Sequence, residues 1–290
     1  MIDKLAAIDD AVAGLTSGMV IGIGGWATRR KPMALVRAIA RSRLTDLTVV
    51  AFGGPDIGLL AATGKIRKLI FGFVSLDHYP LDPHFRTARQ DGRLDVLELD
   101  EGLVHWGLRA AAMRMPFLPS RIGIGTSVAD QPGLKTVRSP YDDGELFLAM
   151  PAIKLDAALI HVSRADRLGN CTILATDPFF DELMARAADK VIVQAEAVVE
   201  TADLGFPEQL RFQPFERSVV TQVVHAPLGA HPTSGGFDYG LDLAHLKTYA
   251  ASAGAAWDDY RTRFVEVAPD AYLAAVGGVD HVRSLPAAIY

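Results

Sequence analysis

The chain has 290 residues, of which half are hydrophobic, so it can bury a large core. Its formal net charge of −5 argues against a nucleic-acid-binding surface, which needs an excess of basic residues. A single cysteine, Cys171, excludes disulfide bonds within the chain and metal sites built from several cysteines.

The first residues, MIDKLAAIDDAVAGL, mix acidic with apolar side chains, which predicts a helix and not a signal peptide. The sequence has no uninterrupted apolar run of about 18 residues, the length that a transmembrane helix needs. We therefore expect a cytoplasmic protein that contacts no membrane.

Short apolar runs then alternate with longer amphipathic stretches. Strands are predicted at SGMVIGIGG (17–25), LTVVAFGG (47–54), KLIFGFVS (68–75), LDVLEL (94–99), LDAALIHVS (155–163) and KVIVQAEAVV (190–199). Helices are predicted at PMALVRAIARSR (32–43), PHFRTARQDG (83–92), HWGLRAAAMRM (105–115) and PFFDELMARAA (178–188). The alternation predicts an α/β fold with an open, mostly parallel sheet and helices on both faces.

Several of these strands end in Gly, Ser or acidic residues. Ligands of open α/β sheets bind beyond the carboxyl ends of the strands, so we expect the functional site at that edge.

Two segments depart from the alternation within what we expect to be one domain, residues 1–290. Residues 112–150 are rich in Gly and interrupted by prolines, and they predict a long excursion over the sheet. The segment APLGAHPTSGGFDYGLD (226–242) predicts a long loop of functional or interfacial importance. Two final helices, 244–263 and 269–277, are expected to pack outside the sheet.

The stretch GIGGWA carries Gly22, Gly24 and Ala27 at the spacing of a dinucleotide-binding fingerprint. That motif needs a helix to begin directly at the pyrophosphate. Here TRRKP intervenes, and Pro32 suits a first helical turn, so a nicotinamide site is disfavoured. Two interpretations stay open: a tight turn, or a loop in which Gly24 and Gly25 approach a ligand and offer N–H groups to an oxyanion.

In VLELDEGLVHWGLRAA (96–111) two carboxylates, Asp100 and Glu101, stand where a strand gives way to a helix. Acidic residues are favoured in the first turn of a helix because they offset the positive end of its dipole. From the spacing alone, this structural role is the better interpretation of both residues.

Four stretches of the sequence, taken together and in order, resemble one family. They are SGMVIGIGGW, the GN of ADRLGNCTI, MARAADKVIVQAEAVVET, and VVHAPLGAHPT followed by DYGLD. They resemble the α subunit of class I coenzyme A-transferases of the glutaconate type, over most of the chain. The resemblance implies an open α/β fold, a β-subunit partner in a heterodimer or α2β2 assembly, and an active site at the α–β junction. It also implies an acyl-CoA substrate and no separate cofactor.

Within this family, GWATRRKPMALVRAI, GGPDIGLL, GFVSLD and LDEGL look most like a hydrolase branch of steroid and cholesterol catabolism, which opens the ring of a cyclic β-oxo acyl-CoA. The catalytic glutamate of that branch corresponds to Glu101. Carbon–carbon hydrolysis beside a ketone needs a base to activate water and an acid to protonate the leaving carbanion, and one carboxylate can do both. Asp100 is expected to be a helix cap.

The resemblance leaves an alternative, since true transferases of the family carry their nucleophilic glutamate on the β subunit. Glu101 would then be structural. A third possibility is that the chain is a non-catalytic partner that only completes a fold and an interface.

Further candidates for substrate or CoA binding are Ser75, Arg29 and Trp26, each beside an alternative structural role. Ser75 can form a local turn, Trp26 can belong to a core or an interface, and Arg29 and Arg30 can be a solvated pair of charges. Asn170 follows Gly169 in an expected turn, where asparagine is favoured for backbone reasons.

The eight histidines show neither the spacing nor the companion acids of a zinc site, so no metal is expected. No G-x-S-x-G elbow occurs, and Cys171 is expected to be a small buried hydrophobic residue and not a nucleophile.

Overall fold

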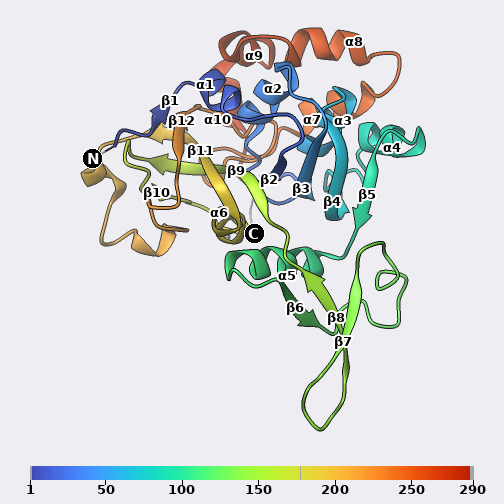
Figure 1. Cartoon of the computed structure of the whole chain (residues 1–290). Helices are drawn as coiled ribbons and strands as arrows, with labels where there is room; N and C mark the ends of the chain where they lie inside the picture. The colour runs from blue at the N-terminus through green and yellow to red at the C-terminus, as the bar shows by residue number, and fades with distance from the viewer. Residues whose placement is uncertain (1, 177, 288–290) are drawn as a thin grey trace.

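The computed structural model describes residues 2–176 and 178–287 (Figure 1). Its large sheet contains β1 (Leu5–Ala6), β2 (Val20–Ile23), β3 (Leu47–Gly53), β4 (Ile66–Val74), β5 (Asp95–Glu98), β9 (Leu155–Ala165), β10 (Cys171–Thr172), β11 (Ala188–Val198) and β12 (Gln222–His225). The order is β1-β12-β11-β9-β2-β3-β4-β5, with every neighbouring pair parallel, and β10 joins β9 as an antiparallel strand. The predicted open, mostly parallel sheet is confirmed.

Helices cover both faces of this sheet, as predicted (Figure 1). One face carries α1 (Ile8–Ala13), α2 (Met33–Arg41), α3 (Pro55–Ala62), α4 (Pro83–Gln90), α7 (Leu243–Ala251), α8 (Trp257–Tyr260), the π-helical turn Arg261–Val265, α9 (Pro269–Ala275) and α10 (Gly278–Ser284). The other face carries α5 (Glu101–Ala112) and α6 (Asp181–Ala187). Two short 3₁₀ turns, Thr201–Leu204 and Leu210–Phe212, lie in the connection from β11 to β12.

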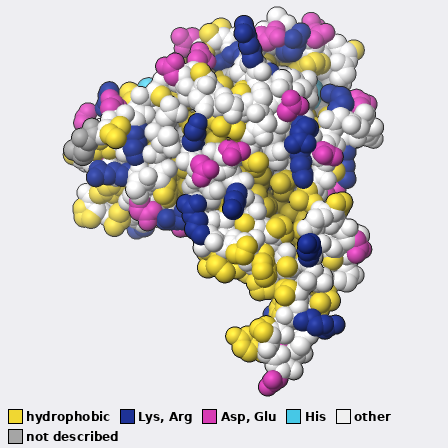
Figure 2. All heavy atoms as spheres, viewed as in Figure 1, with side chains coloured by type: hydrophobic (Ala, Val, Ile, Leu, Met, Phe, Trp, Pro, Cys, Tyr) yellow, Lys and Arg dark blue, Asp and Glu magenta, His cyan; other side chains and the backbone are white. Residues whose placement is uncertain are grey.

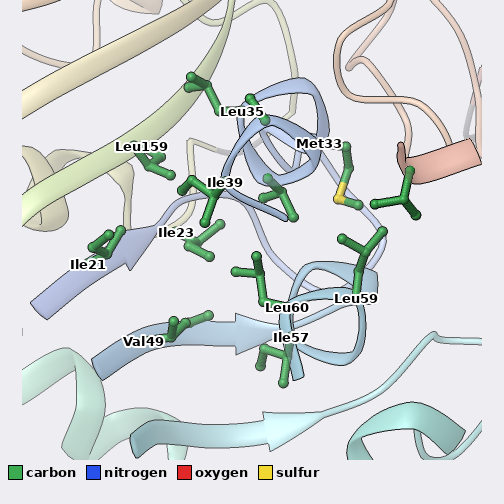
Figure 3. Close-up of a cluster of buried hydrophobic side chains, with 14 of the residues drawn as sticks. Ile21, Ile23, Met33, Leu35, Ile39, Val49, Ile57, Leu59, Leu60 and Leu159 are labelled. Carbon is green, nitrogen blue, oxygen red and sulfur yellow. The ribbon is translucent and has the colours of Figure 1, made fainter. Parts of the chain in front are cut away.

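Each face has its own hydrophobic core because neighbouring residues of a strand point to opposite sides. In β2 and β3, Ile21, Ile23 and Val49 pack against α2 and α3 in the larger core (Figure 3). In β3, Val50 and Phe52 point the other way, toward α5 and α6. β3 is buried along its whole length, as expected for a strand with helices on both sides.

The strand order changes direction between β2 and β9. From β2 the chain proceeds outward through β3, β4 and β5, whereas from β9 it proceeds the other way through β11 and β12. A crevice forms beyond the carboxyl ends of the two strands at such a point, and ligands of open α/β sheets bind there. The loop that follows β2 begins at this position.

The excursion at 112–150 contains a small sheet that the sequence does not predict. Its strands β6 (Phe117–Ser120), β7 (Lys135–Arg138) and β8 (Leu146–Pro151) pair antiparallel in the order β6-β8-β7. We call residues 117–151 the arm, because they project away from the main sheet beside α5 (Figure 1). One face of this sheet is buried, since Leu148 and Met150 of β8 belong to the core beside α5, and Pro119 lies in β6, an edge strand, where proline is tolerated.

The two ends of the chain differ in detail from the sequence prediction. The expected N-terminal helix is a short strand, β1, followed by α1, and the expected helix 244–263 is broken into α7, α8 and a π-helical turn. α3, α10 and β12 are additional elements. The segment 226–242 is irregular as expected. Residues 228–236 are buried and fill the interior, whereas Phe237 and Asp238 are exposed.

Within the described parts of the chain, no helix combines the length and the apolar character that crossing a membrane requires.

Candidate active site

The loop after β2, residues 24–30, folds back on itself at the carboxyl edge of the sheet. Trp26 and Arg29 exchange two backbone hydrogen bonds, of 3.0 and 2.9 Å. Gly25 has φ +73°, and a Cβ atom there would lie 2.4 Å from the Arg29 carbonyl oxygen, so only glycine fits this turn. α2 begins only at Met33, after Pro32 as its N-cap, which confirms that the dinucleotide-binding geometry is not met.

The N–H groups of this loop are all used within the protein. Gly24 donates to the Leu159 carbonyl oxygen at 2.8 Å, and Gly25 donates to Asp181 Oδ1 at 2.8 Å. Trp26 donates to Arg29, and the next residue, Ala27, donates to Phe52 at 3.0 Å. The hypothesis that Gly24 and Gly25 offer N–H groups to an oxyanion is therefore wrong for this conformation, and these glycines serve the close packing of the loop.

A buried ion pair fixes the loop from the other side. Arg30 Nη1 lies 2.8 Å from Asp181 Oδ2, and both side chains are almost completely buried. Arg30 Nη1 also lies 3.3 Å from the His161 carbonyl oxygen. The alternative of a solvated charge is thus wrong for Arg30, because its guanidinium is buried against a carboxylate. The partner, Asp181, is distant in sequence and is the first residue of α6.

Glu101 is the first residue of α5, directly after the edge strand β5. Asp100 is the N-cap, and its Oδ1 accepts a hydrogen bond from the Leu103 N–H at 2.6 Å, which confirms the predicted cap. Gly72 of β4 makes room for this helix start, because a Cβ atom at Gly72 would lie 2.7 Å from both the N and the Cα atom of Glu101. The glutamate is thereby held against the sheet and not out in solvent.

Trp26 brings the β2 loop and α5 together. Its indole Nε1 donates a hydrogen bond to Glu101 Oε1 at 3.1 Å. The Trp26 ring meets Phe73 edge-on, with centroids 5.1 Å apart, and stacks on Phe179 at 5.8 Å. Glu101 is partly buried and so lies at an aromatic-walled, partly enclosed position at the carboxyl edge, where the sequence prediction expects a site.

Arg29 and Ser75 lie at the same edge. The Arg29 guanidinium carbon is 5.0 Å from the centroid of the Trp26 ring, a cation–π arrangement. Ser75 Oγ accepts a hydrogen bond from the Asp77 N–H at 2.9 Å, which is the local turn role that the sequence left open. Binding of substrate by Arg29 or Ser75 stays a prediction.

His105 lies one helical turn after Glu101 on α5 and was not singled out from the sequence. Its ring packs 5.1 Å from the ring of Phe180. Burial, together with the charge of Arg109, lowers the pKa of His105, so the imidazole is neutral near pH 7. Arg109 Nη2 lies 3.2 Å from His105 Nε2, and because arginine can only donate, the ring proton is on Nδ1.

Asn170 and Cys171 have structural roles. Asn170 Nδ2 donates to Asp166 Oδ2 at 2.6 Å within a tight turn. Cys171 is fully buried in β10, and burial strongly raises the pKa of its thiol, which leaves it protonated and unreactive. Both observations agree with the interpretation from sequence.

The important residues that the sequence analysis missed are Asp181, Gly72 and Phe179. A glycine inside a strand signals close approach of another backbone, so Gly72 had a detectable signature. Asp181 had no such signature, because an acidic residue in the first turn of a helix is ordinarily explained by its interaction with the helix dipole. In the part of the chain that is described, no group of three or more His, Cys, Asp or Glu side chains is placed to hold a metal ion.

Comparison with known proteins places this geometry in a family. The profile of the family described as Coenzyme A transferase matches residues 5–210. The chain is 50% identical over 283 residues to the "Cholesterol ring-cleaving hydrolase IpdA subunit" of Rhodococcus jostii, covering 94% of this chain and 96% of the relative. It is 46% identical to the protein of the same name from Mycobacterium tuberculosis, covering 95% and 98%.

Among solved structures, glutaconate coenzyme A-transferase from Acidaminococcus fermentans superimposes with a TM-score of 0.92 at 27% identity, covering 98% of this chain and 96% of that one. The family match extends over most of the chain, and the two hydrolase subunits match it along nearly their whole length. The chain belongs to the coenzyme A transferase family.

Proposed function

We propose that this chain is the α subunit of a hydrolase that opens the ring of a cyclic β-oxo acyl-CoA in the breakdown of cholesterol or a related steroid, with Glu101 as general acid and base. The observation that carries the proposal is a carboxylate held by Trp26 at the carboxyl edge of the sheet, in a chain 50% identical to a cholesterol ring-cleaving hydrolase subunit.

The reaction needs two proton transfers that one carboxylate can perform. The ionised Glu101 takes a proton from water as the water oxygen bonds to the ring ketone carbon. The bond between that carbon and the neighbouring α-carbon of the thioester then breaks, which leaves a carboxylic acid and an enolate. Glu101 returns its proton to the α-carbon, so water is consumed, the ring is opened and the carboxylate is regenerated.

The enolate that forms on the thioester side needs hydrogen-bond donors. The N–H groups of Gly24 and Gly25 are bonded inside the protein, so they do not supply them in this conformation. We assign these donors to the partner subunit.

The partner that we propose is a β subunit of the same family, seated on α5 and the arm. Figure 2 shows hydrophobic side chains gathered over α5 and the arm. The exposed large apolar residues at the end of α5 and in the arm are Met113, Met115, Phe117, Ile122 and Leu146. The arm reaches the start of α5, because a Cβ atom at Gly102 would lie 2.7 Å from Ile122 Cδ1. A partner that covers this apolar surface therefore also closes over Glu101. We expect two αβ pairs to assemble into an α2β2 tetramer.

The central test is Glu101→Gln in the complex co-expressed with the β subunit. Removal of a general base should lower turnover of a cyclic β-oxo acyl-CoA by about 100-fold or more. Glu98→Gln is the matched control, because Glu98 lies three residues earlier and forms an exposed ion pair with Arg89. Turnover of the assembled Glu101→Gln complex within a few-fold of the parent would show that Glu101 is only structural and that the chain completes a fold.

The second candidate function is that of a true CoA-transferase α subunit, which the match to glutaconate coenzyme A-transferase supports. In that case the β subunit forms a glutamyl-CoA thioester, and Glu101 is not needed. Hydroxylamine or borohydride trapping of the acyl-CoA-treated complex distinguishes the two. A modified β-subunit glutamate and CoA transfer to a free acid would favour the transferase, and ring-opened product without a trapped thioester would favour the hydrolase.

A further inference from the structure

We infer that Trp26 is a positioning residue that determines which oxygen of Glu101 exchanges the proton. The inference rests on the proposed acid–base role of Glu101 and adds to it an assignment of the two carboxylate oxygens: Oε1 is held by the protein, and Oε2 faces the chemistry.

The assignment follows from the nature of the indole group. Trp26 Nε1 lies 3.1 Å from Glu101 Oε1, and an indole N–H can donate a hydrogen bond but cannot accept one. A carboxylate oxygen accepts more strongly when it is charged, so a proton placed on Oε1 would weaken this bond. Proton uptake on Oε2 instead leaves Oε1 as a carbonyl oxygen, which still accepts from the indole N–H, and is therefore favoured.

The donor stands in a fixed place because the indole ring is held on several sides. Phe73 meets it edge-on with an interplanar angle of 62°, Phe179 stacks on it at 15°, and the Arg29 guanidinium carbon lies 5.0 Å from its centroid. These contacts leave little freedom for the ring to rotate away from Glu101. A rigid donor restricts the carboxylate to one orientation, which is the purpose of a positioning residue.

The backbone under the ring is equally constrained. Trp26 is paired with Arg29 across the turn, and the preceding Gly25 N–H is bonded to Asp181. Asp181 in turn holds Arg30 at 2.8 Å. Glu101 on α5 and Asp181 on α6 are thus connected through the β2 loop, so two helices on the same face of the sheet fix the donor and the acceptor.

A second tryptophan of the chain provides a comparison. Trp106 lies on α5, the helix that also carries Glu101, and donates its Nε1–H to the Pro119 carbonyl oxygen at 2.9 Å. Both indoles satisfy their N–H groups, as partly buried tryptophans usually do. Only Trp26 does so on a carboxylate at the carboxyl edge of the sheet. Trp106→Phe therefore removes an equivalent N–H group from the same helix without touching Glu101.

The test compares Trp26→Phe with Trp106→Phe in the αβ complex. Phenylalanine keeps an aromatic ring and removes the N–H donor. Loss of a hydrogen bond to a charged group should lower kcat by about 10- to 100-fold, with KM within about 3-fold, because substrate contacts are largely preserved. Trp106→Phe should leave both constants nearly unchanged. If Trp26→Phe fails to assemble, the comparison is made between Trp26→His, which retains a ring N–H, and Trp26→Leu, which does not. Trp26→His should assemble and keep more kcat than Trp26→Leu.

A double variant separates this inference from the proposed function. In the Glu101→Gln background, Trp26→Phe should cause no further loss of kcat, since the two residues act as a unit. Trp26→Phe that behaves like Trp106→Phe, or that raises KM at constant kcat, overturns the positioning role even when Glu101→Gln is inactive. Full activity of Glu101→Gln instead overturns the proposed function itself, and the inference with it.

Discussion

Arg30 and Lys31 are consecutive buried cations that serve opposite faces of the sheet. Arg30 pairs with Asp181 of α6 on the face that carries Glu101, at 2.8 Å. Lys31 pairs with Asp56 of α3 on the other face, at 3.2 Å, and the side chains of both residues are fully buried. Two neighbouring residues thus supply the same kind of interaction to two different regions of the molecule.

The two pairs differ in what else depends on them. On the site face, both oxygens of Asp181 are used, one by the Gly25 N–H and one by Arg30, so the pair shapes the β2 loop. On the other face, burial lowers the pKa of Lys31 and raises the pKa of Asp56, because desolvation outweighs their mutual attraction. The pair of Arg30 and Asp181 orders the β2 loop. The pair of Lys31 and Asp56 lies in the core, where desolvation of the two charges costs folding free energy.

A third buried carboxyl lies close to the second pair. Asp82 caps α4, accepts a hydrogen bond from Tyr249 Oη at 2.8 Å, and is fully buried. Burial raises the pKa of Asp82 to about 7, and the nearby charge of Asp56 adds to the effect. We therefore expect the stability of the face opposite the candidate site to depend on pH through Asp82.

The largest effect is expected from Asp181→Ala. It leaves the buried Arg30 charge without its carboxylate and releases the Gly25 N–H, which should cost about 3–5 kcal/mol of unfolding free energy in urea denaturation. Turnover should fall as well, because the Trp26 donor loses its support. Asp181→Asn keeps an oxygen for Gly25 and should lose less of both. Equal loss in the two variants would contradict the role assigned to the Gly25 bond.

An intermediate effect is expected from Asp82→Asn, as a change in pH dependence. The folded chain retains a proton on Asp82 that the unfolded chain releases above about pH 4, so unfolding free energy falls as pH rises toward 7. The total decline is at most about 4 kcal/mol. Asparagine does not ionise, so the variant should lack this decline and be more stable than the parent at pH 8.

Urea denaturation of the complex between pH 4.5 and 8 measures the difference. The control is Asp95→Asn, at an exposed carboxyl on β5, which should preserve the slope of the parent. The same slope in Asp82→Asn and in the parent would show that Asp82 does not titrate in this range.

The smallest effect is expected from the double replacement Lys31→Met and Asp56→Leu. A buried ion pair exchanged as a whole for apolar residues is often neutral, or stabilising by about 1–4 kcal/mol. Turnover should stay within about 2-fold, because this pair lies on the face opposite Glu101. A large loss of turnover without loss of stability would show instead that the two faces are coupled.

Much of the fold was predictable from local patterns. The six apolar runs singled out in the sequence all form strands, and the four predicted helices between them are present as α2, α4, α5 and α6. β12 and the arm strands were not predicted. β12 has only four residues, and prolines interrupt the arm, so neither carries a clear periodic signal. The small arm sheet depends on pairing with β8, which is a tertiary property.

The candidate site was predictable in part. Its position at the carboxyl edge and the cap at Asp100 follow from strand–helix alternation and capping chemistry. The oxyanion role of Gly24 and Gly25 does not hold in this conformation, because the partners of their N–H groups come from β9 and α6, far along the chain. The buried ion pair of Arg30 was missed for the same reason, since nothing local in the sequence indicates Asp181.

The sequence by itself determined the α/β class, the family resemblance and the presence of a glutamate where an edge strand gives way to a helix. Tertiary structure alone decided that Trp26 meets Glu101 across 75 residues and that Gly25 meets Asp181 across 156. The physical reason is that periodicity records which side of an element is buried. Hydrogen bonds between distant elements depend instead on how the sheet orders its strands.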